Sequence, residues 1–326
     1  MGSKVRMTIM VGDYDITRPI LDGTVQPQGV DLTVLTAPSP PRHWRMLKHR
    51  EFDAAELSMG SYVTRRGRGE DDLVAIPVFP HRRFRHGYVF ASARSDIRRP
   101  SDLSGAAIGI RSWQTTAGVW LRGILGEHHG LALDQVRWVA QDSEDVPLDL
   151  PPGVHVDRVP AGRTITEMCV EGELAGLIYP EIPGPIRRNE GTIRRVFHNP
   201  KSAEQEYYRT TGIFPIMHTV AIRAELLAAH PWIARNLFDA FQEAKRLAYE
   251  RMEDPRTVSL AWLRALIEEE RALLGRDPWE YGLSDRNRRT LERFLGYAGE
   301  QGMVGRDVTV DGLFYPSTLE TPPRSV

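Results

Sequence analysis

The first 65 residues alternate strand-like and helix-like segments, and this alternation limits the possible folds most strongly. Short apolar strands are expected at Met7–Val11, Val30–Leu35 and Ala54–Ser58. Helical patterns occupy Pro40–Phe52 and begin again at Met59. A β-α-β-α-β order favours a parallel sheet with right-handed crossovers. Ligands of such sheets bind beyond the carboxyl ends of the strands, where this chain carries polar side chains.

A second unit of alternating elements is expected after Ala93. Its strands are predicted at Ala107–Ile110, Val136–Val139, Val154–Val159 and Leu174–Tyr179, and its helices at Ala117–Leu125 and Thr166–Glu171. Residues 184–206 are polar and basic, which indicates a surface connection. The remaining elements are a strand at Thr219–Ile222, a long helix from His230, helices at Val258–Leu274 and Ser284–Gly299, and an extended strap at Thr321–Arg324.

These elements predict an α/β fold of two hinged lobes with a ligand cleft between them and C-terminal helices. Lobe 1 is expected to comprise residues 1–92 and 212–326, and lobe 2 residues 93–211. The chain would cross between the lobes near Ala91–Ser95 and again near Thr210–Thr219.

The stretch Phe79–His86 carries three arginines and two histidines between apolar, strand-like residues. Such a cationic turn suits the binding of a small dianion and the transfer of a proton, whereas the alternative is a solvated basic turn. Its place beside the expected hinge favours a substrate-binding wall. Arginine pairs with a carboxylate through two hydrogen bonds, which favours a planar, multiply anionic substrate.

Other polar segments complete a candidate site. Ser112 to Thr116 follow an expected strand and begin a helix, which suits either an anion cradle or an ordinary N-cap. The aromatic residues Tyr207, Tyr208 and Trp113 would line a pocket or simply pack in a core. The candidate catalytic residues are His86, His218, Asp15 and Glu56. The candidate substrate-binding residues are Tyr14, Ser58, Arg82, Arg83, Phe84, Arg85, Tyr208, Ser112, Gln114, Thr115 and Thr116.

Composition excludes several classes of function. The 326 residues carry a net charge of -1, so no global basic field exists for nucleic acid or an anionic membrane. One cysteine, Cys169, excludes an internal disulfide and indicates a buried structural thiol. No dinucleotide fingerprint, P-loop, nucleophile elbow or H-E-x-x-H motif occurs. The N-terminus runs directly into a strand without a signal-like apolar run, which predicts a cytoplasmic protein.

Several segments resemble the 4,5-dihydroxyphthalate decarboxylase family, whose fold is similar to type II periplasmic binding proteins. They are Gly12–Asp15, Arg50–Ser58, Phe79–His86, Ser112–Ala117, Pro160–Thr164 and Gly212–His218, in order along the chain. The resemblance implies non-oxidative loss of CO₂ from a hydroxylated aromatic acid, 4,5-dihydroxyphthalate-like, with a protocatechuate-like product. It also implies a small anionic aromatic substrate, no cofactor, and a possible homo-oligomer.

In such chemistry a general acid protonates the ring carbon that bears the leaving carboxylate, while a ring hydroxyl is polarised. The resemblance therefore implies that Arg82, Arg83 or Arg85 orients carboxylates and that His86 or His218 donates the proton. Asp15 or Glu56 would polarise the hydroxyl. One alternative is a solute-binding protein of the ABC-transporter type that closes on an aromatic or carboxylate ligand without catalysis. Another is a metal-assisted lyase or hydrolase that uses His81, His86 and His218 with Glu56 or Asp15.

Overall fold

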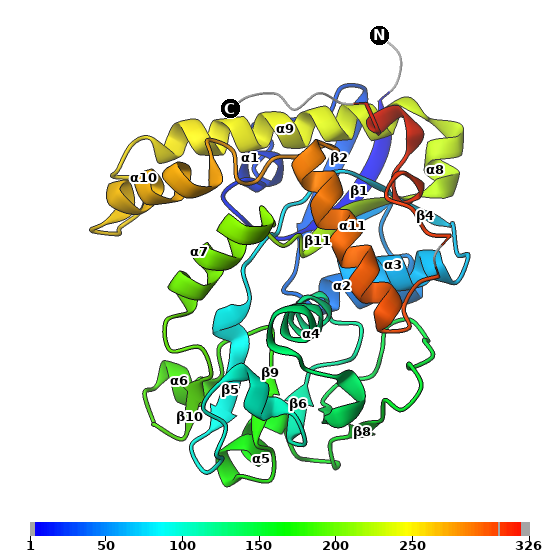
Figure 1. The fold of residues 1–326 in the computed structure, drawn as a ribbon. Coiled ribbons are helices and arrows are strands. Elements are labelled where there is room, and N and C mark those ends of the chain that lie inside the picture. The colour runs from blue at the N-terminus through cyan, green and yellow to red at the C-terminus, as the bar shows by residue number, and fades with distance from the viewer. Residues whose placement is uncertain (1–3, 306, 321–326) are drawn as a thin grey trace.

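The computed structural model describes residues 4–305 and 307–320, which form two sheets, one in each lobe (Figure 1). The first sheet has the order β2-β1-β3-β11-β4. Its strands are β1 (Val5–Val11), β2 (Val30–Thr36), β3 (Ala54–Ser58), β4 (Leu73–Ile76) and β11 (His218–Arg223). β1 pairs in parallel with β2 and β3, as expected, and β11 is antiparallel to β3 and β4. The intervening helices are α1 (Arg18–Leu21), α2 (Pro41–His49) and α3 (Met59–Gly67).

The second sheet has the order β10-β5-β9-β6-β7-β8. Its strands are β5 (Val89–Ser92), β6 (Ala107–Ile110), β7 (Arg137–Ala140), β8 (Val156–Arg158), β9 (Gly176–Ile178) and β10 (Ile193–Arg195). β6 is parallel to β7 and β9, whereas β5 is antiparallel to β9 and β10. Helices α4 (Thr116–His129) and α5 (Ile165–Glu171) belong to this unit. The predicted α/β fold is confirmed, and each lobe contains one sheet.

Residues 184–206 are not the plain surface connection that their polarity suggested. They contain α6 (Gly184–Arg187), the edge strand β10 and the first part of α7 (Pro200–Thr211). The Asn199 side chain caps α7 by accepting from the Ser202 N–H at 3.1 Å, and Pro200 occupies its first turn. In β10 only the first of three residues, Ile193, is buried, and the other two are arginines. So short and basic a segment gives no alternating pattern from which a strand could be predicted.

The passage from the first sheet to the second lies between the end of β4 and the start of β5. Since β5 begins at Val89 and pairs with β9 and β10, this passage precedes the crossing expected near Ala91–Ser95. A 3-10 turn, η1 (His86–Tyr88), ends it. The return passage runs from α7 into β11, in the expected region. We propose the two lobes as expected, except that the first passage comes before Val89, so that β5 belongs to lobe 2.

The C-terminal helices cover the first lobe and reach the second. They are α8 (Ala224–Ala229), α9 (Trp232–Met252), α10 (Leu263–Leu274) and α11 (Asp285–Glu300), as Figure 1 shows. α9 runs along the first sheet, and α11 contacts both α3 and α4. The remaining 3-10 turns are η2 (Pro100–Leu103), η3 (Leu133–Gln135), η4 (Asp311–Leu313) and η5 (Pro316–Thr318). The expected strap at 321–324 lies outside the described residues.

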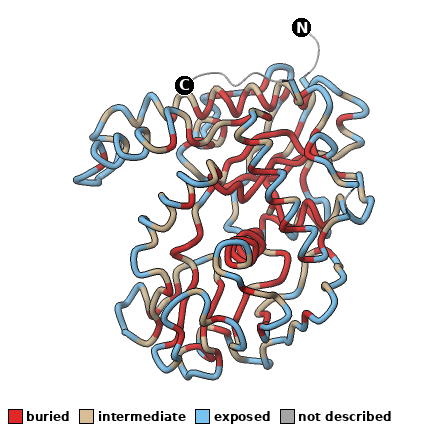
Figure 2. Tube along the Cα trace, in the orientation of Figure 1, coloured by how far each residue is buried: buried red, intermediate tan, exposed pale blue. Residues whose placement is uncertain are grey.

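Helix α4 lies between the two cores and is buried along most of its length (Figure 2). Trp120 and Ile124 pack in the core of the first lobe, whereas Leu121 and Leu125 pack in that of the second. The Trp120 indole N–H donates to the Ile216 carbonyl at 2.9 Å, just before β11. The lobes are therefore joined by an apolar helix as well as by two chain crossings. Among the described residues, no helix has the length and apolar character needed to span a bilayer.

Candidate active site

A cavity of about 710 Å³ lies where the strand ends of both sheets meet, and we call it the interlobe cavity. Tyr14 and Ser58 reach it from the ends of β1 and β3 in the first sheet. Arg111, Asp142 and Glu181 reach it from beyond β6, β7 and β9 in the second. Its volume is in the usual range for small-molecule sites, and its position follows the rule for parallel sheets.

Glu56 is the buried anion behind this cavity. It lies on β3, fully buried, and four donors converge on its carboxylate. Oε2 accepts from the Gly12 N–H at 2.8 Å, and Oε1 accepts from the Tyr14 hydroxyl at 2.9 Å. Oε1 also accepts from Arg42 Nη2 at 3.1 Å and from His218 Nδ1 at 2.5 Å. The carboxyl group therefore acts only as an acceptor, and Arg42 balances its charge.

His218 begins β11 and faces the interlobe cavity. It pairs across the sheet with Ser58, two residues from Glu56, so the three side chains share one face of the sheet. Since a carboxylate only accepts, Nδ1 of His218 carries the hydrogen and Nε2 is left for a group in the cavity. Burial, then the charges of Arg42 and Arg85, hold the pKa of His218 well below its ordinary value. The imidazole is therefore neutral at rest.

Two further histidines surround His218 at the wall of the cavity. The His43 ring lies 4.7 Å from that of His218, and the His81 ring lies 4.6 Å away. His43 Nδ1 donates to the Glu56 carbonyl at 3.0 Å, which leaves Nε2 to accept from the Ser39 hydroxyl at 2.8 Å. Burial lowers the pKa of His43 to about 3 and holds that of His81 well below its ordinary value. His43 is thus fixed in place.

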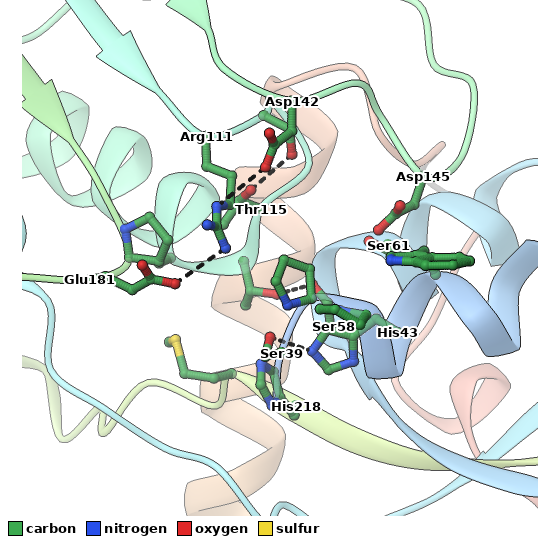
Figure 3. A pocket seen from close by; sticks show the side chains of 18 of the residues that line it. Ser39, His43, Ser58, Ser61, Arg111, Thr115, Asp142, Asp145, Glu181 and His218 are labelled. Carbon is green, nitrogen blue, oxygen red and sulfur yellow. Dashed lines mark hydrogen bonds and ion pairs between the residues drawn. The ribbon is translucent and has the colours of Figure 1, made fainter. Parts of the chain in front are cut away.

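Two arginines contribute positive charge to the interlobe cavity, Arg85 from the first passage between the sheets and Arg111 from the end of β6. Arg85 is buried; its Nη1 donates to the Pro180 carbonyl at 2.9 Å, and its Nε lies 3.2 Å from Met217 Sδ. Burial lowers the pKa of Arg85 to about 10, which leaves it cationic at neutral pH. Arg111 lies between two carboxylates (Figure 3), 3.3 Å from Glu181 and 3.4 Å from Asp142.

Hydroxyl groups link the two lobes at the floor of the cavity. Ser58 at the end of β3 lies 2.7 Å from the Thr116 hydroxyl at the start of α4, and Thr116 also accepts from the Gly60 N–H at 2.9 Å. Ser112 and Thr115 are hydrogen-bonded to each other at 2.8 Å. These side chains offer hydroxyls to a bound ligand next to the N-terminus of α4.

Within residues 4–305 and 307–320, no three side chains of His, Cys, Asp or Glu are placed to hold a metal ion. The ring nitrogens of His43 and Nδ1 of His218 are instead engaged by Ser39 and Glu56.

Sequence comparison with characterised proteins identifies the family to which the chain belongs. No family model matches the chain. A 4,5-dihydroxyphthalate decarboxylase from Comamonas testosteroni is 35% identical over 327 residues, which cover 98% of this chain and 99% of the relative. The chain belongs to the 4,5-dihydroxyphthalate decarboxylase family. An enzyme of the same name from Pseudomonas putida is 33% identical over 213 residues, covering 64% of this chain and 83% of that protein. The protein is therefore a decarboxylase, which is a carboxy-lyase, as predicted.

Solved structures confirm the expected fold of this family member. The sulfonate-binding protein SsuA from Methylobacillus flagellatus KT has a TM-score of 0.59 at 12% identity and covers 100% of this chain and 99% of its own. The alkanesulfonate-binding protein SsuA from Xanthomonas axonopodis pv. citri, bound to MOPS, has a TM-score of 0.57 at 13% identity. That match covers 97% of this chain and 99% of the other. The chain has the two-lobed fold of type II periplasmic binding proteins.

About half of the predicted site residues line the interlobe cavity of this family member. They are Tyr14, Ser58, Arg85, Ser112, Thr115, Thr116 and His218, with Glu56 directly behind them. The others are Asp15, Arg82, Arg83, Phe84, His86, Gln114 and Tyr208, which lie outside its lining.

The side chains outside the cavity have identifiable partners. Arg82 is buried and donates to the carbonyls of Phe214 and Glu280 and to Asn287, so it ties the hinge to the C-terminal region. Gln114 exchanges two hydrogen bonds with the Val146 backbone. Arg83 is exposed and donates to the Tyr88 hydroxyl at 2.8 Å.

His86 lies in an aromatic cluster rather than in the cavity. Its ring centroid is 5.2 Å from that of Phe197 and 5.3 Å from that of Tyr207. Burial, then neighbouring His129 and His128, lowers the pKa of His86 to about 4. Phe84 packs similarly, 6.3 Å from Tyr208 and 4.7 Å from Phe214. Asp15 is exposed and lines a different cavity.

Three residues at the site, His43, Arg42 and Arg111, are not among those predicted from the sequence. His43 shares the buried face of α2 with Met46 and Leu47, a spacing that places a histidine among core positions. Arg111 directly follows β6, so the rule for the carboxyl ends of strands applied to the second sheet would have found it. The sequence places His81 in the cationic turn and among possible metal ligands but not among the candidate catalytic residues, although its ring contacts that of His218.

Proposed function

We propose that this decarboxylase acts on a hydroxylated aromatic dicarboxylate of the 4,5-dihydroxyphthalate type and releases a protocatechuate-like product. The names of both curated relatives support this substrate class. The interlobe cavity adds a physical argument, because it combines arginines, hydroxyls and neutral histidines in about 710 Å³. That volume accommodates one substituted benzene ring with its ordered water.

The two arginines would receive the two carboxylates. Arg85 is fixed by Pro180 and keeps its charge, which suits a permanent anchor. Arg111 is held at rest by Glu181 and Asp142, both about half exposed, so an incoming carboxylate competes with them for the guanidinium. Glu181 repels carboxylates but accepts hydrogen bonds from hydroxyls. The arrangement therefore favours a ring that carries hydroxyls as well as carboxylates.

The Glu56–His218 pair would transfer the proton, and its geometry is the observation that carries the proposal. Glu56 holds Nδ1 of His218 at 2.5 Å and leaves Nε2 for the substrate. Negative charge of the bound substrate raises the pKa of His218, so that Nε2 becomes protonated in the complex. Nε2 then gives its proton to the ring carbon that bears the leaving carboxylate. A C–H bond forms, the C–C bond breaks as CO₂ leaves, and its electron pair restores the aromatic ring.

We also propose that the reaction needs no metal or other cofactor, since it requires only proton transfer and charge stabilisation. Treatment with a chelator, followed by gel filtration, should leave the rate of CO₂ release unchanged. A loss of rate that added divalent metal restores would contradict this part of the proposal.

The proposal is tested by incubating the purified protein with 4,5-dihydroxyphthalate and measuring CO₂ together with the aromatic product. Phthalate is the matched control, because it carries both carboxylates but neither hydroxyl. We expect CO₂ from the first compound and none from the second. If 4,5-dihydroxyphthalate raises the melting temperature without any CO₂ release, the solute-binding alternative holds and the proposed substrate is wrong.

A further inference from the structure

A second cavity, of about 380 Å³, lies between α10 and the body of the first lobe, and we call it the α10 cavity. It is separated from the interlobe cavity by two side chains, Tyr14 and His81, which line both. Tyr14 donates to Glu56, and the His81 ring contacts that of His218. The wall between the two cavities is therefore in direct contact with the proposed proton-transfer pair.

The inner face of α10 is directed at this cavity. Leu263, Leu266 and Ile267 have the i, i+3, i+4 spacing of one helical face, and all three line the α10 cavity. Such an apolar face usually packs against a core, whereas here it encloses open space together with Ile16 and Trp279 of the body. The aromatic ring of a small ligand would fill the α10 cavity, which the protein's own side chains leave empty.

The charged groups of the α10 cavity favour an anion. Four arginines line it, Arg82, Arg83, Arg271 and Arg276, against two carboxylates, Asp15 and Glu270. Arg271 is paired with Glu253, and Arg82 is engaged by Asn287 and backbone carbonyls. Arg276 is exposed and forms no ion pair with another residue of the described chain. It is thus available to a ligand carboxylate.

We propose that the α10 cavity is a second binding site, for an aromatic monocarboxylate, coupled to the interlobe cavity through Tyr14 and His81. The aromatic and apolar wall receives the ring, and Arg276 receives the carboxylate. A ligand in the α10 cavity contacts and displaces Tyr14. The Tyr14 hydroxyl and His218 Nδ1 both donate to Glu56 Oε1, so a shift of Tyr14 changes the hydrogen bonding of His218. A bound ligand therefore changes the turnover of the neighbouring site as well as the affinity for substrate.

Calorimetric titration with benzoate tests the site without any need for turnover. We expect Ile267→Trp, which fills the cavity, to bind one equivalent fewer than the wild-type protein. Arg276→Ala should weaken binding at this site by about tenfold, the effect of losing one charge-assisted hydrogen bond. Arg256→Ala is the matched control, because Arg256 lies in the segment before α10 and pairs with Asp254. Equal stoichiometry and affinity in all four proteins would overturn the proposal.

Steady-state inhibition by benzoate tests the coupling. In the wild-type protein benzoate should lower kcat and raise KM, whereas in Ile267→Trp it should raise KM alone. The same pattern in both proteins would refute the coupling. If sedimentation shows that Ile267→Trp dissociates an oligomer while its benzoate stoichiometry is that of the wild type, the α10 cavity is covered by a second copy and the proposal is wrong. Absence of CO₂ release would refute the proposed function and leave the calorimetric result intact.

Discussion

His218 has two properties that suit its proposed role as the proton donor to carbon. Its ring is held by a buried carboxylate, so its orientation is fixed. Its pKa is far below the ordinary histidine value, so Nε2 carries no proton until negative charge enters the interlobe cavity. The proposed substrate, with its two carboxylates, would supply that charge. In the proposed mechanism His218 is therefore an acid only in the presence of substrate.

If His218 is the proton donor, kcat/KM and kcat should have different pH profiles. The free enzyme has a low His218 pKa, so kcat/KM should fall about tenfold per pH unit through the neutral range. In the complex the pKa is raised, so kcat should stay level to a higher pH before it falls. Initial rates of CO₂ release between pH 5 and pH 8 check this expectation. The expectation would be contradicted if kcat and kcat/KM began to fall at the same pH, or if either increased with pH.

Replacement of Glu56 by Gln should damage both stability and activity. The amide cannot balance buried Arg42, whose side chain is 3% exposed, and unpairing a buried charge costs about 3–5 kcal/mol. Glu51→Gln is the control, because Glu51 forms a solvent-exposed pair with Arg45, and exposed pairs contribute little to stability. Urea unfolding and CO₂ release are the measurements. Similar losses in both variants would show that Glu56 has no special role.

At the scale of the elements, the junction of α3 and α4 places the hydroxyls of the site. A Cβ on Gly60 would lie 2.0 Å from the Gln114 carbonyl oxygen, so the backbones of the two lobes touch here because Gly60 has no side chain. The same approach brings the Gly60 N–H to the Thr116 hydroxyl. Glycine at this position thus fixes the distance between Ser58 and Thr116.

Gly60→Ala should therefore destabilise the protein by about 1–3 kcal/mol, the usual cost of overpacking, and should raise KM by shifting the hydroxyls. Gly126→Ala within α4 is the matched control. Its nearest contact would be 3.4 Å, and alanine favours a helix over glycine by up to about 1 kcal/mol. Thermal unfolding and KM measurements on both variants separate them. A Gly60→Ala protein as stable as Gly126→Ala would exclude a close contact at this junction.

The sequence predicted the regular elements well but not every side-chain direction. The rule for strand ends found Tyr14, Glu56 and Ser58, because residues that follow parallel strands share one edge of the sheet. The Phe79–His86 stretch contains no strand or helix before η1, so no periodicity indicates which way each side chain points. Arg82 points to the C-terminal region and Arg85 to the cavity, although only three positions separate them.

At the scale of the whole molecule, the interlobe cavity is assembled from distant parts of the chain. Arg111 and His43 come from different lobes, and His43 contacts both the Glu56 carbonyl and the ring of His218, which meet across β3 and β11. Along the chain, all strands of the second sheet, β5 to β10, come before β11, which belongs to the first sheet. Such partners depend on long-range pairing, which local patterns do not contain. Which side chains of the site contact one another therefore could not be predicted from the sequence.

Neutral buried histidines also make the stability of the whole molecule depend on pH. Where the native pKa is below the unfolded value, the unfolded chain binds more protons as pH falls, and the free energy of unfolding decreases. For His86, with a pKa of about 4 against 6.5, this loss begins near pH 6.5 and continues to about pH 4. Between pH 6.5 and 5 one such histidine accounts for about 2 kcal/mol.

His86→Leu should therefore lose less stability than the wild-type protein when the pH is lowered from 7 to 5. Urea unfolding at the two pH values measures the difference, and His155→Leu at an exposed position is the control. The same pH dependence in His86→Leu and in the wild type would show that His86 is not a neutral buried group.

The most direct test of the central claim compares two histidines in one assay. CO₂ release from 4,5-dihydroxyphthalate is measured for wild-type protein, His218→Gln and His86→Asn. His218 lines the interlobe cavity and His86 packs in the aromatic cluster. We expect His218→Gln to lose roughly a hundredfold or more in kcat and His86→Asn to keep the wild-type value. Wild-type turnover in His218→Gln, or an equal loss in His86→Asn, would contradict the assignment of the proton donor.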